Sequence, residues 1–279
     1  MMGPSHSMSG AAAWLGLTAV ASNTPALSFI PTDPTSIIVG TMVAAGAALA
    51  PDIDSYGSTV VRSFGIFGRL FYTIANGVSL FFANLVRTGK DETKENGHRT
   101  LFHTILFAGL AGFLTYLAGQ SSREVEIFDQ TYSLGTVLTL VILGIFLHLG
   151  LGGLFVKPIA KARSNVGPYI MMLFTAAITL GVAWFMNQNE STTQTYPWLG
   201  LAVGFGWFIH LMGDMITKMG VPLLWPIPWR GRMWWNFAPP TFMRITAGGT
   251  IENVIIFPAL TILTIVLAGW HIATQIGVL

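Results

Sequence analysis

An imidazole and a carboxylate stand four residues apart in one apolar stretch of the sequence, at His210 and Asp214. Residues at this spacing lie on the same face of an α-helix, where both side chains can bind one metal ion. Ionisable side chains inside apolar membrane segments are costly and are usually functional. The pair is therefore the first candidate for metal chemistry, in a helix that the GVPLLWP sequence from Gly220 ends.

Three further groups of histidines and aspartates occur along the chain. They are His6, Asp52 with Asp54, and His98 with His103. Pro51 predicts an extended turn that holds both aspartates with their carboxylates on one side. Thr100 is expected to cap the next helix, leaving His98 in the loop and His103 in the first turn. Since the sequence has no cysteine, any metal ion must be held by His, Asp, Glu and water.

The composition is that of a polytopic membrane protein. Of the 279 residues, 52% are hydrophobic and only 9% are charged, and the mean hydropathy is +0.62. These values lie outside the usual balance of soluble domains. We expect an all-α membrane bundle of about seven spans, forming one integral membrane domain over residues 1–279. The formal net charge of +2 gives no reason to expect a nucleic-acid partner.

The expected spans lie in seven apolar segments. These are Ser9 to Ser22, Ser36 to Ala50, Leu101 to Gly119, Leu134 to Val156, Tyr169 to Met186, Trp198 to Ile216 and Val254 to Ile272. An eighth apolar segment, Ile66 to Val86, has basic residues at both ends. We interpret it as a re-entrant or interfacial helix, because a further crossing there would invert the topology of everything upstream.

The distribution of basic residues predicts the topology. Lysine and arginine gather in four connections, which hold Arg62 and Arg69, Arg87 to Arg99, Lys157 to Arg163, and Lys218 to Arg244. The loops 120–133 and 187–196 carry only Arg123. The positive-inside rule predicts a multi-pass protein of the inner (plasma) membrane, with a cytoplasmic N-terminus and an outside C-terminus. All the His and Asp groups then lie at the cytoplasmic membrane face.

Four sequence motifs carry a resemblance to a known family. In order they are His6 in PSHSMSGAAAWL, then LAPDIDS, HRTLFHT and HLMGDMITKMGVPLLWP. They resemble the early His and the LPDIDH, HRGxTHS and HxxxDxxTxxGVxLLWP signatures of the YdjM-like family. Its members are LexA-regulated, inner-membrane-associated proteins that are predicted to be metal-dependent hydrolases. About a third of the chain, residues 108–198, has no counterpart motif.

The resemblance implies a metal-dependent hydrolase and a set of ligands. The implied ligands are His6, Asp52, Asp54, His98, His103, His210 and Asp214, holding one or two divalent ions, with zinc expected first and manganese or iron as alternatives. Asp54 and Arg99 are expected to take part in catalysis. Where the family usually has a histidine, this chain has Ser55, so His148 or Glu252 is a candidate replacement ligand or supporting residue. A packed, hydrogen-bonded His148 is an equal alternative, and His271 is expected to be interfacial.

The expected position at the membrane face favours an amphipathic substrate, such as a phospholipid or a lipid-linked phosphoester. Arg230 and Arg232, with Arg99 and Arg244, could bind phosphate oxygens. The surrounding tryptophans, Trp225, Trp229, Trp234 and Trp235, could set the depth of this loop among lipid headgroups, although simple anchoring is the commoner role of such a loop. Two alternatives remain open: an ion- or proton-coupled transporter, which no internal repeat supports, and a metal-stabilised structural or regulatory membrane protein.

Overall fold

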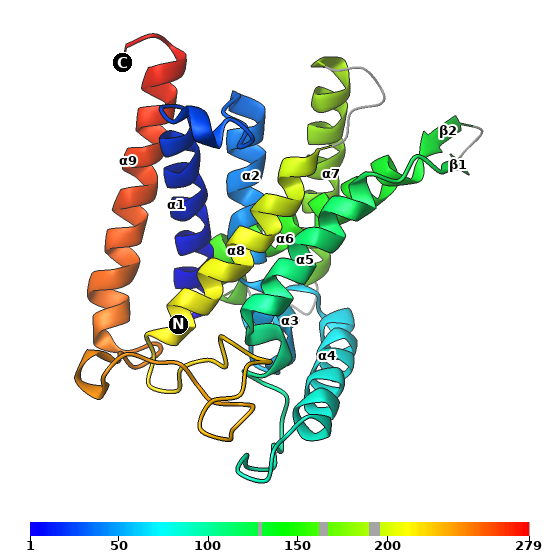
Figure 1. The fold of residues 1–279 in the computed structure, drawn as a ribbon. Coiled ribbons are helices and arrows are strands. Elements are labelled where there is room, and N and C mark those ends of the chain that lie inside the picture. Colours follow the sequence, from blue (N-terminus) through cyan, green and yellow to red (C-terminus); the bar gives the residue numbers. More distant parts are fainter. Residues whose placement is uncertain (128–129, 162–166, 190–195, 279) are drawn as a thin grey trace.

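The protein is a bundle of helices, as the composition predicts (Figure 1). The structure, a computed structural model, describes residues 1–127, 130–161, 167–189 and 196–278. Its helices are α1 (Gly3–Ala21), α2 (Pro34–Ala47), α3 (Thr59–Ser63), α4 (Ile66–Leu85), α5 (Ile105–Gly119), α6 (Leu134–Lys161), α7 (Gly167–Asn189), α8 (Pro197–Met215) and α9 (Phe257–Gln275). The two termini lie at opposite ends of the bundle (Figure 1).

A short β-hairpin lies between α5 and α6, so the prediction of a purely helical chain is wrong in this loop. Strands β1 (Glu124–Ile127) and β2 (Gln130–Ser133) pair antiparallel, with Glu124 opposite Ser133. Val125, Ile127, Thr131 and Tyr132 are residue types that favour strands over helices. The hairpin projects away from the bundle (Figure 1), and its described residues contribute nothing to the His and Asp groups.

Among the described residues, four helical segments are long and apolar enough to cross a membrane. They are Pro34–Asp54, Ile66–Leu85, Leu134–Gly153 and Glu252–Gln275, and two shorter apolar helices are Ile105–Gly119 and Gly167–Val182. Each of the seven apolar segments of the sequence does contain a helix, but a count of seven crossings is not confirmed. The basic connection from Lys157 to Arg163 runs into residues 162–166, which lie outside the described part of the chain.

Helix α4 meets the length and hydropathy of a span, but it packs through one narrow stripe. Only Gly68, Ala75, Ser79 and Ala83 of this helix are buried. Its large apolar side chains, such as Phe67 and Phe81, remain exposed. In Figure 1 it lies at the end of the bundle where the loops gather. Its interpretation as a re-entrant or interfacial helix stays a prediction.

Helix α2 forms the centre of the bundle and contacts α1, α6 and α8. Gly10 of α1 and Gly206 of α8 approach it so closely that a Cβ atom on either would lie 2.4 Å from the Ala44 carbonyl oxygen. Large side chains fill the remaining space, including the fully buried Trp14 and Leu147. This close packing brings the end of α2, the start of α1 and the last turns of α8 to one place.

Candidate metal centre

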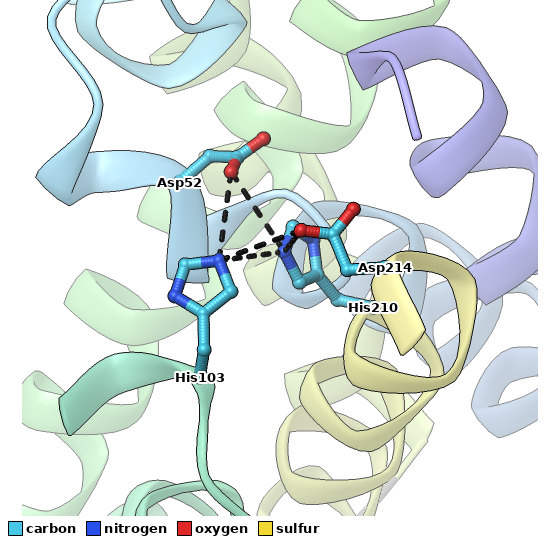
Figure 2. A group of neighbouring side chains, drawn as sticks. All are labelled: Asp52, His103, His210 and Asp214. Atoms are coloured by element: carbon cyan, nitrogen blue, oxygen red, sulfur yellow. Dashed lines mark hydrogen bonds and ion pairs between the residues drawn. The ribbon is translucent and has the colours of Figure 1, made fainter. Parts of the chain in front are cut away.

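Three separate parts of the chain bring four ligand side chains together (Figure 2). Asp52 comes from a 3₁₀ turn, Ala50–Asp54, that follows α2. His103 ends a second turn, Leu101–His103, just before α5. His210 and Asp214 lie one helical turn apart in the last turns of α8, as their spacing predicts. The predicted convergence of these distant motifs is therefore present in the structure.

The ligand atoms of the four residues are spaced as the ligands of one metal ion. The Nε2 atoms of His103 and His210 are 3.2 Å apart. Asp214 Oδ2 lies 3.7 Å from His210 Nε2 and 3.8 Å from His103 Nε2, and Asp52 Oδ1 lies 3.8 Å from both nitrogens. A tetrahedral ion with bonds of 2.0–2.2 Å separates its ligand atoms by about 3.3–3.6 Å. Most of these separations are too long for hydrogen bonds and suit a shared ion.

The backbone of α2 fixes the orientation of His210. Its Nδ1–H donates to the Ala48 carbonyl oxygen at 2.8 Å. The proton therefore lies on Nδ1, and the lone pair of Nε2 is free to face Asp52 and Asp214. A backbone carbonyl behind a histidine is the usual support of a metal ligand. His103, His210 and Asp214 are 0–1% exposed, so this geometry is held in a water-poor interior.

Arg99 is buried beside Asp214 and does not face open solvent. Its Nη2 lies 2.8 Å from Asp214 Oδ2, and its Nη1 donates to Thr217 Oγ1 at 2.8 Å and to the Gly220 carbonyl at 3.1 Å. The backbone φ of Arg99 is +55°, which is uncommon for a residue with a side chain. Arg99, which the sequence analysis expects to be catalytic, therefore forms a buried ion pair with Asp214.

His6 reaches the cluster from the first turns of α1, which begins at Gly3, six residues before the expected span. Its ring stacks on His210 with centroids 3.9 Å apart, and its Nε2 lies 3.1 Å from Asp214 Oδ1. The amino group of Met1 also contacts Asp214. His6 is therefore at the cluster but outside the four-ligand group, and its role as a ligand stays a prediction.

Asp54 and His98 adjoin the cluster on the other side of His103. Asp54 Oδ1 pairs with His98 Nδ1 at 2.8 Å. Two local predictions are wrong here. The aspartates lie in a 3₁₀ turn instead of an extended one, because Pro51 is well tolerated at the start of such a turn. Thr104, not Thr100, caps α5 by accepting the Phe107 N–H at 3.1 Å, so His103 precedes the helix.

His148 and Glu252 lie elsewhere and belong to neither described ligand group. His148 Nε2 donates to the Ser63 carbonyl at 3.0 Å, which ties α6 to α3. Glu252 begins a π-helical turn, Glu252–Ile256, before α9. Its carboxylate accepts the N–H groups of Met2 at 2.6 Å and Gly248 at 2.7 Å. The structure brings neither residue into a ligand group with the other histidines and aspartates, and their roles as replacement ligands or supporting residues stay predictions.

His271 is buried between α1 and α9, and its predicted position at the membrane interface stays a prediction. Its Nε2 lies 3.0 Å from the Leu15 carbonyl oxygen and 3.1 Å from Thr18 Oγ1. A polar partner on the neighbouring helix allows an imidazole to pack inside a bundle. The residue therefore joins two helices away from the metal ligands.

Arg230 and Arg232 line a separate cavity of about 1140 Å³ in the long loop before α9. Its aromatic and charged lining includes Trp229, Trp234, Trp235, Asp91 and Lys94. Trp229 and Arg232 form a bridge across a tight turn in which Arg230 has a φ of +50°. None of the four ligands lines this cavity.

Asp91 ties this loop to the loop that precedes the His98 motif, a contact that the sequence analysis missed. Its carboxylate accepts the N–H groups of Thr88 at 2.8 Å, Met233 at 2.9 Å and Trp234 at 3.1 Å. Partial burial acts to raise the pKa of Asp91, but these hydrogen bonds outweigh it and hold the pKa below its ordinary value. Nothing in the local sequence distinguishes Asp91 from other surface acids.

Comparison with known proteins places the chain in a family. Residues 1–157 and 170–275 match the family described as YdjM inner membrane protein. The Inner membrane protein YdjM of Escherichia coli (strain K12) is 31% identical over 83 residues, which are 28% of this chain and 38% of that protein. The protein of the same name from Shigella flexneri matches equally, and no solved structure matches. Since the family match covers most of the sequence, this chain belongs to the YdjM family of inner membrane proteins.

Proposed function

We propose that the protein is a membrane-embedded, metal-dependent hydrolase that acts on a phosphoester or a lipid-linked substrate. The observation that carries this proposal is the spacing of the ligand atoms of Asp52, His103, His210 and Asp214, which all lie within 4.8 Å of one another. The two histidine nitrogens lie 3.2 Å apart, and each lies 3.7–3.8 Å from both carboxylates. Two imidazoles and two carboxylates are a donor set that suits zinc first, with manganese and iron as alternatives.

A divalent ion held by these residues would polarise a phosphoryl or carbonyl oxygen and lower the pKa of bound water to about 7. The chain's own residues prepare the place for it. The Ala48 carbonyl orients His210, and Arg99 holds Asp214 in position by a charged contact. The partly exposed His98 marks the side of the cluster that solvent reaches, because its side chain is 28% exposed while that of Asp54 is fully buried.

The location of the cluster supports a substrate that approaches along a membrane face. Asp52 follows the end of α2, His103 precedes α5 and Asp214 lies near the end of α8. A transporter would place such groups near the middle of its helices, so this position favours the hydrolase over the transport alternative. The arginine- and tryptophan-lined loop cavity offers groups that suit an anionic headgroup.

The first test is metal analysis of detergent-purified protein by plasma mass spectrometry. Asp52→Asn and His210→Ala are expected to lose the bound ion, since each removes a ligand of the same site. His148→Ala is the matched control, because it removes a buried histidine outside the cluster. Retention of the full wild-type metal content by His210→Ala, or absence of metal from wild type after reconstitution, would overturn the proposal.

Activity is tested separately in proteoliposomes that contain phosphoester lipids. Wild type is expected to release a water-soluble phosphate-bearing product, and Asp52→Asn is expected to release none while inserting normally into the membrane. Flux of a solute without any covalent product would instead support the transporter. Loss of folding together with metal, seen as aggregation in size-exclusion chromatography, would support a structural role.

A further inference from the structure

A second group of possible ligands adjoins the first and shares His103 with it. Asp54, His98 and His103 each offer a ligand atom, and these atoms lie within 4.8 Å of one another. The side chains of Asp54 and His103 are fully buried, and His98 is at the edge of the cluster. One carboxylate and two imidazoles with an open position form a ligand set that catalytic zinc sites use.

His103 can serve both groups because its two ring nitrogens face different neighbours. Nε2 faces Asp52, His210 and Asp214, and the second nitrogen points away from these residues in Figure 2. That second nitrogen, Nδ1, lies 3.5 Å from Asp54 Oδ2. Metal binding displaces protons from its ligands, so each nitrogen of one imidazole can hold an ion.

Two atoms of this second group are buried without a hydrogen-bond partner. They are Asp54 Oδ2 and His103 Nδ1, which face each other. Buried polar atoms in native proteins are nearly always paired, and an ion is one of the partners that can satisfy them. Their separation of 3.5 Å is long for an N–H···O bond and agrees with the spacing of about 3.3–3.6 Å between two ligands of one ion.

The alternative is that Asp54 only orients His103, as carboxylates often do behind a metal-bound histidine. Such an orienting hydrogen bond would have the length seen between Asp54 Oδ1 and His98 Nδ1, which is 2.8 Å. The contact to His103 is longer and leaves both of its atoms unsatisfied. The geometry therefore favours shared coordination over orientation.

We propose that the protein holds two divalent ions that share His103. The first is bound by the four-ligand group, and the second by Asp54, His98 and His103 Nδ1. This inference rests on the proposed function, because the first ion is the ion of that site. The second ion lies toward the exposed His98, where water completes its coordination.

The charges around the two ions indicate what binds there. Asp52, Asp54 and Asp214 carry three negative charges, and a His103 that binds ions through both nitrogens carries a fourth. Arg99 and the amino group of Met1, which both contact Asp214, carry two positive charges. Two divalent ions therefore leave an excess of positive charge. An anionic phosphoester would neutralise that excess, and a bound divalent ion would polarise its phosphoryl oxygen.

The test counts metal ions per chain in reconstituted, detergent-purified protein. Wild type and the His148→Ala control are expected to hold two zinc ions, and His98→Ala is expected to hold one. His210→Ala is expected to keep the second ion and lose the first, whereas His103→Ala should lose both. Size-exclusion chromatography and circular dichroism verify that each variant is folded.

The possible failures separate the two proposals. One ion in wild type that His98→Ala retains and His210→Ala loses would overturn the shared site and leave the proposed function intact. Absence of metal from wild type would overturn both.

Replacement with Cu²⁺ gives a second readout, because two Cu²⁺ ions joined by one imidazole are magnetically coupled. Electron paramagnetic resonance should show that coupling in wild type and an isolated-ion spectrum in His98→Ala; an isolated-ion spectrum in doubly loaded wild type would contradict the bridge.

Discussion

The His and Asp cluster and the arginine-lined loop cavity differ in how their side chains are held. His103, His210 and Asp214 are 0–1% exposed and come from the turn before α5 and the last turns of α8. Trp229, in the loop cavity, is 56% exposed and lies in a tight turn of an otherwise irregular segment. The cluster is suited to hold an ion in fixed geometry, and the cavity is suited to contact a variable, partly solvated ligand. Substitutions should therefore separate metal retention from substrate binding.

The largest effects are expected from substitutions that disrupt either the cluster or the loop cavity and leave the other region intact. His210→Ala should lose the ion of the four-ligand group and abolish hydrolysis of a phosphoester lipid. Arg230→Ala with Arg232→Ala should keep full metal content but raise the KM for an anionic lipid by about 10²–10⁴-fold, since it removes two charged hydrogen bonds to a phosphate that contribute about 1.5–3 kcal/mol each. Metal analysis and proteoliposome kinetics check this pair.

Loss of metal from the double arginine variant would contradict the proposed independence of the cluster and the loop cavity, because the two regions would then depend on each other. Phe242→Ala is a matched control for the loop. Its side chain is 86% exposed and does not line the cavity, so both metal content and KM should stay unchanged.

A smaller effect is expected from Arg99, which supports the cluster without being one of its four ligands. Arg99→Ala removes the charged partner of Asp214 Oδ2 at 2.8 Å and should weaken metal binding by about 10–100-fold. Arg99→Lys should recover only part of this affinity, because a lysine cannot hold Asp214, Thr217 and Gly220 together. Competition with a fluorescent chelator measures the affinity; an unchanged affinity in Arg99→Ala would remove this residue from the metal centre.

The sequence predicted the cluster because its residues are chemically rare in apolar segments. His210 and Asp214 at helical spacing, and the aspartates at the end of α2, stand out against their neighbours. Their convergence depends on close helix packing that a single sequence does not specify. Gly10 and Gly206 permit that packing, but many glycines in the chain have no such role.

Local backbone conformation and tertiary hydrogen bonds were harder to predict. Thr100 and Thr104 both satisfy the composition rule for a helix cap, and only the tertiary fold selects Thr104. His148 and Glu252 are ionisable residues in apolar surroundings like the ligands. Their partners, the Ser63 carbonyl and the Met2 and Gly248 amides, come from distant segments. Residue type therefore identified candidates, and packing decided which of them met.

The smallest effect concerns the carboxylate that holds the loop cavity. The pKa of Asp91 is below its ordinary value of 3.8, so its hydrogen bonds stabilise the loop above about pH 4, and this contribution is lost as the pH falls through the lowered pKa. Asp91→Asn should alter tryptophan emission at pH 6, where the carboxylate accepts the backbone N–H of Trp234, and the difference from wild type should disappear near pH 2.

The metal content of Asp91→Asn at neutral pH should equal that of wild type, since Asp91 belongs to neither ligand group. If the difference in emission persisted unchanged at the lowest pH, the charge of Asp91 would not be what holds the loop. The cavity would then depend on tryptophan stacking instead.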